Sequence, residues 1–290
     1  MAEGFRTVVL YENYAEAKTT TLSGGSYSGS LPITLLQDRD TNAVARTTDA
    51  LITSTIIKAD LGSAQIIGGI AVCNGNWSLD STYRIEISND SGFSSLLYDS
   101  GWVEFPGFTV DPSELDPSDP DYGDGVLRNT LLPEFPLNLA HVLKSDITGR
   151  YVRISFDDTA NVDTYLQYGY LFIGRAFRPS INYSEDNGYT PAADVNDVFE
   201  TLGLTRIYSE YGSKRVWQAR FPSLATGELF GSLTRMLVKS RTSRPVFVVI
   251  DPTATLHMQS LSFLATMQKA PAIQQLLVER GTTAFEFREL

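Results

Sequence analysis

In the first half of the chain, apolar residues recur in short runs that are separated by turn residues. Runs at 56–62, 66–72 and 83–90 are each followed or closed by Gly, Asn, Asp and Ser clusters, which typically bound β-strands. Such runs return about every ten to fifteen residues, a spacing typical of an all-β sandwich. The pattern therefore predicts three consecutive strands of one sandwich.

The third of these runs shows the clearest alternation. Ile85 and Ile87 alternate with Arg84 and Glu86. In an antiparallel sheet with one wet face, successive side chains point to opposite sides. We therefore expect the isoleucines to face the core and the two charged side chains to face solvent.

Strand patterns return at 151–155 and 168–174, and they are interpreted as the closing strands of the same domain. Between the early and late strands, residues 110–126 combine prolines with many acidic residues. That composition is too polar and too broken for a core, so it predicts a surface loop. The first domain is assigned to residues 12–174, after an N-terminal arm at 1–11.

The remaining residues, 175–290, are assigned to a second β domain with one principal helix. The helix is predicted at 226–239, opened by a Thr226 cap and closed by basic residues. Its apolar stripe is Leu229, Phe230, Leu233, Met236 and Leu237. Strands are predicted at 213–221, 245–252, 261–267 and 284–290, and a short helix at 195–202.

Charge and cysteine content narrow the function classes. The chain has 290 residues, a formal net charge of -11 and a single cysteine, Cys73. The negative charge disfavours nucleic acid and anionic membrane surfaces as partners. One cysteine allows no internal disulfide, and Cys73 is expected to be a small buried apolar group. The N-terminus lacks a signal-like layout, and no run of about 18 apolar residues is present to insert into a membrane, so we expect a soluble chain made in a cytoplasm.

The strand ending in Asp60, Leu61 and Gly62, the apolar strand after it and the strand closing on Ser88, Asn89 and Asp90 resemble a discoidin, or factor 5/8 C-type, domain. The resemblance covers residues 12–174. It implies a galactose-binding-like jelly-roll β-sandwich that binds a ligand and does not transform it. Such domains can carry calcium in their early loops, and the oxygen ligands available there are Asp38, Asp40, Asn42 and Asp49.

Catalytic motifs are not found. The only histidines, His141 and His257, lie in no recognisable motif for a hydrolase, and zinc and phosphate-binding motifs are missing. The acidic loop contains Asp119, but the EF-hand positions counted from it hold Asp124 where glycine is needed and Thr130 where glutamate is needed. We therefore expect no enzyme activity, with a polysaccharide-cleaving enzyme as the least favoured hypothesis.

Aromatic residues offer a candidate sugar contact. Trp77 is surrounded by polar turn residues, so an exposed ring that stacks on a sugar is weighed evenly against a packed one. With Asn76 and Tyr83 it forms the candidate glycan-binding set. Trp102 is expected to pack in the core instead.

The order of elements from 172 to 290 resembles the C-terminal part of tail-tip proteins of long-tailed bacteriophages, the distal tail protein class. The resemblance implies a structural virion protein of the tail tip or baseplate that forms a homo-oligomeric ring and contacts tail-tube and hub proteins. It also implies residence in the virion after synthesis in the host cytoplasm. The alternative is a lectin-like protein that recognises host cell-surface polysaccharide, and both can hold together.

Overall fold

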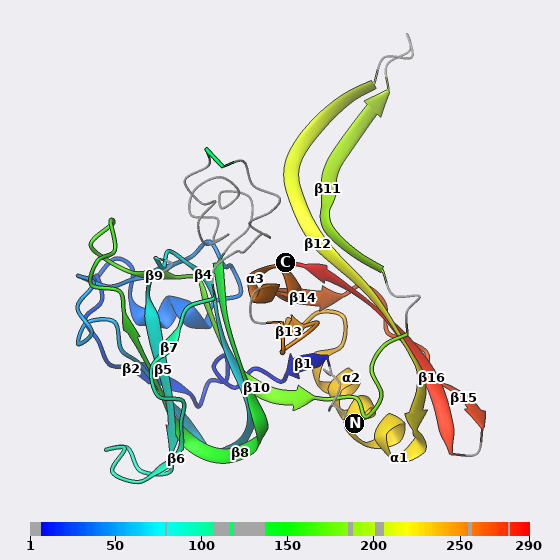
Figure 1. The fold of residues 1–290 in the computed structure, drawn as a ribbon, viewed down its shortest axis with the longest axis horizontal. Coiled ribbons are helices and arrows are strands. Elements are labelled where there is room, and N and C mark those ends of the chain that lie inside the picture. Colours follow the sequence, from blue (N-terminus) through cyan, green and yellow to red (C-terminus); the bar gives the residue numbers. More distant parts are fainter. Residues whose placement is uncertain are drawn as a thin grey trace. The chain divides into compact units, whose positions relative to one another are not determined.

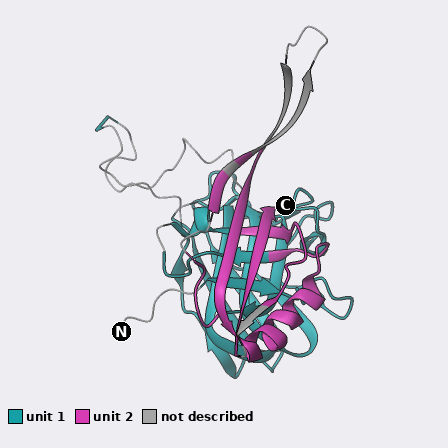
Figure 2. Cartoon of the chain, turned by 90° about the vertical axis from the view of Figure 1, so that its right-hand side faces the viewer, with its two compact units in different colours: residues 1–178, 247–262 teal, residues 179–246, 263–290 magenta. Residues whose placement is uncertain are grey.

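The computed structural model describes residues 7–78, 80–106, 117–118, 137–184, 188–200, 206–254, 257–277 and 279–290 (Figure 1). The chain is mainly β, which confirms the predicted fold class. It divides into two compact units (Figure 2). Unit 1 comprises Met1–Arg178 and Phe247–Ser262, and unit 2 comprises Pro179–Val246 and Phe263–Leu290. No helix within the described ranges is long and apolar enough to span a membrane.

Unit 1 is built from antiparallel strands in the order β13-β1-β10-β4-β8-β5-β6. Strand β2 is added on β4, strand β7 on β5, and β3 pairs with β9 separately. The elements are β1 (Val8–Tyr11), β2 (Thr21–Ser23), the 3-10 helix η1 (Ile33–Gln37), β3 (Ala45–Arg46), β4 (Ile57–Gly75), β5 (Thr82–Ser88), β6 (Leu96–Asp99), β7 (Val103–Glu104), β8 (Leu137–Asp157), β9 (Gln167–Tyr168), β10 (Tyr170–Phe177), β13 (Val246–Val249) and α3 (Met258–Leu261).

The first two predicted strands form one continuous bent strand, β4. It pairs with β8 on both sides of the bend (Figure 1), and the largest register shift lies between Asp60 and Gln65. Gly62 lies in that shift with a φ of 78°, a conformation that side-chain-bearing residues rarely adopt. Asp60 accepts a bond from the Gly62 N–H and pairs with Arg150 of β8. The predicted turn is therefore a bend that keeps the two strands paired.

Strand β5 confirms half of its predicted alternation. Ile85 and Ile87 are fully buried in the core of unit 1. Glu86, predicted to face solvent, is only 3% exposed, so that part of the prediction is wrong. Its carboxylate is covered by ion pairs with Arg153 of β8 and with Arg84. The opposite face of this sheet is thus covered by paired charges instead of water.

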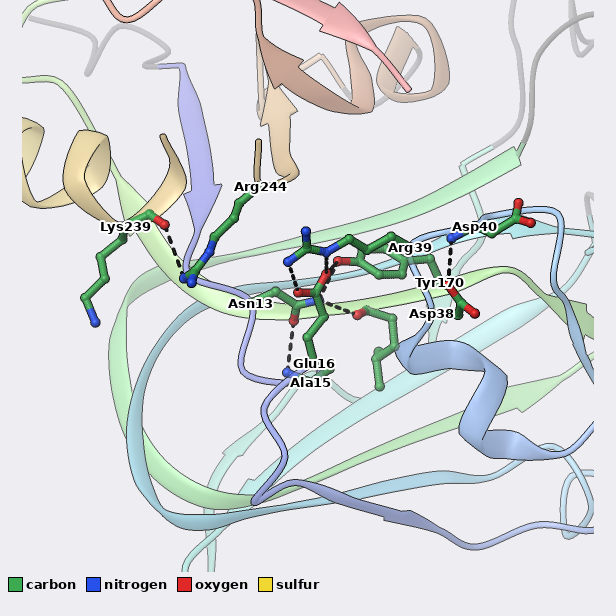
Figure 3. A network of polar contacts seen from close by, with 10 residues as sticks. Asn13, Ala15, Glu16, Asp38, Arg39, Asp40, Tyr170, Lys239 and Arg244 are labelled. Carbon is green, nitrogen blue, oxygen red and sulfur yellow. Dashed lines mark hydrogen bonds and ion pairs between the residues drawn. The ribbon is translucent and has the colours of Figure 1, made fainter. Parts of the chain in front are cut away.

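The described part of the predicted N-terminal arm contains a strand. Residues Val8–Tyr11 form β1, which lies between β10 and β13. The turn after β1 is held by Asn13, which donates to the Leu171 carbonyl at 2.8 Å and accepts from the Ile173 N–H at 2.9 Å. Glu16 follows, paired with Arg39 and accepting a bond from the Tyr170 hydroxyl (Figure 3). Residues Val8–Tyr11, which were predicted to belong to an arm, are therefore part of the unit 1 sheet.

Unit 2 has the strand order β11-β12-β16-β14, with β15 added on β16. Its elements are β11 (Gly188–Glu200), β12 (Arg206–Ala225), α1 (Thr226–Glu228), the π-helical turn η3 (Leu229–Leu233), α2 (Thr234–Ser240), β14 (Ser262–Met267), β15 (Gln274–Leu277) and β16 (Arg280–Glu289).

The predicted helix at 226–239 is present as the continuous run α1, η3 and α2. Leu229, Leu233 and Met236 of its stripe are fully buried, as predicted. Phe230 is 56% exposed, because a residue next to Leu229 lies about 100° around the helix from it. The helix start has no side-chain cap, so the predicted Thr226 cap is wrong.

The short helix predicted at 195–202 is wrong for its described part, which belongs to strand β11. β11 pairs with β12 from Gly188↔Gln218 to Glu200↔Arg206. Cross-strand pairing over this length overrides the weak helical pattern of so short a segment. β16 pairs with β12 only from Val216 to Ala225, so β11 and β12 continue past it as a two-stranded ribbon (Figure 1).

A buried ion pair stabilises the core of unit 2. Arg215 is 1% exposed and donates its N–H and its Nε to Glu289 Oε2, at 2.8 and 2.9 Å. Trp217 stacks on Phe287 beside this pair, with ring centroids 5.6 Å apart. Taking away one partner of a buried pair leaves an uncompensated charge in the core, which is strongly destabilising.

We expect Glu289→Ala to lower the free energy of unfolding by about 3 kcal/mol or more, because Arg215 loses its buried partner. Chemical denaturation followed by circular dichroism measures this change. Glu279→Ala, at an exposed position of unit 2, is the control and is expected to have little effect. The double variant Arg215→Met, Glu289→Leu is expected to recover most of the loss. Equal stability of Glu289→Ala and the wild-type protein would contradict the role of the pair.

Candidate functional site

The loops at one end of unit 1 bring an arginine and a tyrosine into direct contact. Arg46 lies on β3 and pairs with Gln167 of β9, and Tyr165 precedes β9. The guanidinium carbon of Arg46 lies 3.4 Å from the centre of the Tyr165 ring. Both side chains are half-buried, so each keeps a solvent-accessible part. A planar cation stacked on a ring in this way is an attractive cation–π contact.

Asn76, which follows β4, fixes the loop that carries the tyrosine. Its Nδ2 donates to Asp163 Oδ2 at 2.9 Å and to the Tyr165 carbonyl at 3.2 Å. Its Oδ1 accepts from the Gln167 N–H at 2.8 Å. Asn76 was predicted as a sugar contact, but both of its amide hydrogens are already used within the protein. It is therefore a positioning residue for Asp163 and Tyr165.

A buried carboxylate forms hydrogen bonds with both the segment after β4 and the segment after β8. Asp158 is 3% exposed and accepts from the Ser78 N–H at 2.9 Å and from Asn161 Nδ2 at 2.7 Å. Asn161 Nδ2 also donates to the Asn76 carbonyl at 2.8 Å. These bonds join the segment after β4 to the segment after β8. The exposed residues of the segment after β8 are thus held in position by these buried hydrogen bonds.

The site offers groups that recognise hydroxyls. The Arg46 guanidinium has no hydrogen-bond or ion-pair partner among the described residues, so its fork of N–H donors is available. Asp163 is exposed and has one carboxylate oxygen without a partner in the described part of the chain. The Tyr165 ring supplies an apolar surface. Donors, an acceptor and a ring close together suit a polyhydroxylated ligand.

Trp77 does not supply the exposed ring. It is 3% exposed and packs against Phe105, Phe156 and Tyr168, with ring centroids 4.8 to 5.8 Å away. A side chain at position 75 would overlap this ring, so glycine at this position leaves the space that the Trp77 ring occupies. Trp102, expected to be packed, is instead 48% exposed. The polar turn around Trp77 was therefore misleading, because the ring turns inward from a polar backbone segment.

Tyr83 is also part of the core and not of a surface site. It is 4% exposed, and its hydroxyl lies 3.2 Å from His141 Nδ1. The hydroxyl of Tyr98 lies 2.8 Å from the other ring nitrogen, Nε2. Burial raises the pKa of Tyr83 and lowers the pKa of His141 to about 4. A neutral imidazole, with one donor and one acceptor nitrogen, satisfies both hydroxyls.

The predicted calcium ligands are not gathered into one site. Asp38 accepts from the Asp40 N–H, Asp40 from the Asn42 N–H, and Asp49 from the Leu51 N–H. Each oxygen thus closes a local turn, and the side chain of Arg39 points away from Asp38 and Asp40 toward Glu16 (Figure 3). Within the described ranges no group of three or more His, Cys, Asp or Glu could hold a metal. The acidic loop at 110–126 lies outside the described residues except for 117–118.

No sequence motif marks Arg46 or Tyr165. They are 119 positions apart, and only the pairing of β3 with β9 brings them together. The single hint in the sequence is that both lie in polar loop segments. Cys73, in contrast, is buried as expected.

The low pKa of His141 predicts a pH dependence of stability. The unfolded chain, with an ordinary histidine pKa near 6.5, binds more protons than the native chain between about pH 6.5 and 4. The stabilisation from neutral His141 is therefore complete above this range and is lost as pH falls through it. We expect His141→Gln to remove a loss of up to about 3 kcal/mol between pH 7 and 4.5.

Thermal unfolding at a series of pH values measures this effect. His257→Gln, at the other and exposed histidine, is the matched control and is expected to keep the wild-type pH profile. A wild-type profile that His141→Gln leaves unchanged would contradict the assignment.

No protein-family model matches the sequence, and no curated protein sequence matches it. Among solved structures, CpGH89CBM32-6 from Clostridium perfringens is similar at 22% identity and a TM-score of 0.35, over 57% of this chain and 99% of that chain. The family 32 CBM from C. perfringens NanJ in complex with galactose is similar at 18% identity and a TM-score of 0.38, over 58% and 99%.

CBM32-1 from a family 31 glycoside hydrolase of C. perfringens is similar at 15% identity and a TM-score of 0.35, over 55% of this chain and 95% of that chain. All three are family 32 CBM structures.

Proposed function

We propose that unit 1 is a carbohydrate-binding module without catalytic activity, and that Arg46, Tyr165 and Asp163 contact the sugar. The observation that carries this proposal is the stacked Arg46–Tyr165 pair with its unpartnered donors. The guanidinium and the carboxylate would bind hydroxyl groups, and the ring would lie against the apolar face of the sugar. Charge-assisted hydrogen bonds of this kind are stronger than neutral ones.

The surrounding charges support the proposal. Acidic residues outnumber basic ones by 34 to 23. Arg84, Arg150 and Arg153 of the same unit all have carboxylate partners. An arginine that stacks on a ring and has no carboxylate partner among the described residues is therefore an exception in this unit. Its guanidinium N–H groups are therefore available to bind a ligand.

We expect Arg46→Ala to weaken sugar binding about tenfold or more, because a hydrogen bond to a charged group contributes roughly 1.5–3 kcal/mol. Tyr165→Ala is expected to weaken binding, and Tyr165→Phe, which keeps the ring, is expected to bind nearly as well as the wild-type protein. A glycan array followed by calorimetry measures these affinities. Galactose, which is bound in the NanJ structure, is the first probe.

Lys144→Ala is the matched control, since Lys144 is an exposed cation of unit 1 outside the site. It is expected to leave affinity unchanged. Two results would overturn the proposal: no saturable binding to any glycan on the array, or binding that neither Arg46→Ala nor Tyr165→Ala weakens.

A second candidate function is the predicted structural role in a phage tail tip, in which copies of the chain form a ring in the virion and contact other tail proteins. The β11–β12 ribbon favours an assembly role. Past the residues of β12 that pair with β16, β11 and β12 pair only with each other within the described ranges. A two-stranded ribbon alone is marginally stable in water and has open edges, so a neighbouring subunit would be a suitable support for it.

For this second candidate we expect a ring that contains the chain at the tail tip of intact particles, seen by electron microscopy. Contacts in a closed ring join different faces of neighbouring subunits. Mass measurement of the isolated chain over a range of concentrations therefore also tests whether copies of the chain associate. A chain that is monomeric throughout and missing from purified particles would contradict the structural role.

A further inference from the structure

A hollow of about 450 Å³ lies on the sheet of unit 2. Strands β12 and β16 supply part of its lining, and the segment between β14 and β15 supplies the rest. Its size is within the range of pockets that bind small molecules, roughly 300–1,000 Å³. Its residues belong to neither the unit 1 site nor the ribbon.

The strand register places the polar lining on one face. In the antiparallel pair of β12 and β16 (Figure 1), Gln218 lies opposite Glu286 and Arg220 opposite Ala284. Residues that face each other, and residues two apart on a strand, share a face. The alternate residue Phe285 is buried on the other face with the aromatic core. The small side chain of Ala284 leaves room above the strand between the polar groups.

A short segment forms the wall of the hollow. It begins after Gln268, whose N–H donates to the Glu286 carbonyl at 2.9 Å. It ends at Gln274, which pairs with Thr282 of β16 through β15. Between these anchors the chain reads Lys-Ala-Pro-Ala-Ile. The segment is thus fixed to β16 at both ends and bulges between them, with Lys269 and Pro271 among the lining residues.

The charge of the hollow differs from that of the chain. Arg220 and Lys269 line it together with a single carboxylate, Glu286. Neither cation has an ion-pair partner in the part of the chain that the structure describes. The chain as a whole carries a net charge of -11. A local excess of positive charge in an acidic protein favours an anionic ligand there.

We propose that this hollow is a second ligand site and that it binds an acidic monosaccharide unit, such as a uronic or sialic acid. Arg220 and Lys269 bind the sugar carboxylate, since guanidinium and ammonium groups are its strongest partners in proteins. Gln218 and Glu286 bind ring hydroxyls, and the apolar wall at Pro271 covers the C–H face of the sugar. The site is independent of the function proposed for unit 1.

Titration calorimetry of the full chain tests the site, with glucuronic acid and N-acetylneuraminic acid as probes. Glucose is the neutral counterpart, and acetate is the bare carboxylate. We expect at least one acidic sugar to bind, and to bind more weakly at high salt because the contacts are charged. Arg220→Gln and Ala284→Phe, which fills the hollow, are each expected to weaken binding about tenfold or more.

Arg235→Gln removes an exposed arginine of unit 2 outside the hollow and is expected to bind normally. Arg46→Ala is also expected to bind acidic sugars normally, which separates this site from the one in unit 1. Three results would overturn the proposal: no binding of either acid, binding unchanged by both Arg220→Gln and Ala284→Phe, or acetate or glucose binding as tightly as the acidic sugars.

Discussion

Unit 1 depends on the antiparallel pairing of β4 with β8, which resumes on the far side of a bend. The N-terminal part of β4 pairs with residues of β8 that also pair with β5, and the C-terminal part of β4 pairs with β10. The two strands therefore link the part of the sheet that contains β5 to the part that contains β10. Because both reverse direction at the bend, the end of β4 and the end of β8 arrive at the same side. That geometry brings together the loops that carry Asn76 and Asp158.

Some side chains of these two loops are buried and pack in the interior, and others remain accessible to a ligand. Trp77 packs inside unit 1, where Phe156 and Tyr168 contact its ring. Asp158 uses its carboxylate to satisfy backbone and side-chain donors of both loops, which offsets the cost of its burial. Only with these groups directed inward is the outer part of the second loop, with Asp163 and Tyr165, held in a fixed position beside Arg46. The position of the site thus depends on the packing of Trp77 and on the hydrogen bonds of Asp158 inside the loops.

What the sequence could predict follows from how local each signal is. Ile85 and Ile87, and the buried stripe at Leu229, Leu233 and Met236, depend on periodicity within one element, and they were predicted. Glu86 was misjudged, because its burial depends on Arg153 from another strand. The Arg46–Tyr165 contact and the inward turn of Trp77 depend on tertiary pairing between distant segments, to which a single sequence gives no access. The bend at Gly62 lies between these cases: its glycine was visible, but continued pairing across it was not.

Charge pairing links the sites proposed for the two units. In a chain rich in carboxylates, an arginine near the surface easily finds an acidic partner, as Arg39, Arg84 and Arg150 do. Such surface pairs contribute little to stability, so leaving an arginine unpaired costs the fold little. Arg46 and Arg220 have no ion-pair partner in the described ranges. Arg46 stacks on the Tyr165 ring, and Arg220 lines the hollow together with Pro271 and the carboxylate of Glu286. An unpaired guanidinium that the fold does not need for stability is available for a ligand. In unit 1 the lack of a carboxylate partner distinguishes Arg46 from the other described arginines, whereas in unit 2 Arg220 is distinguished by its place in the lining of the hollow.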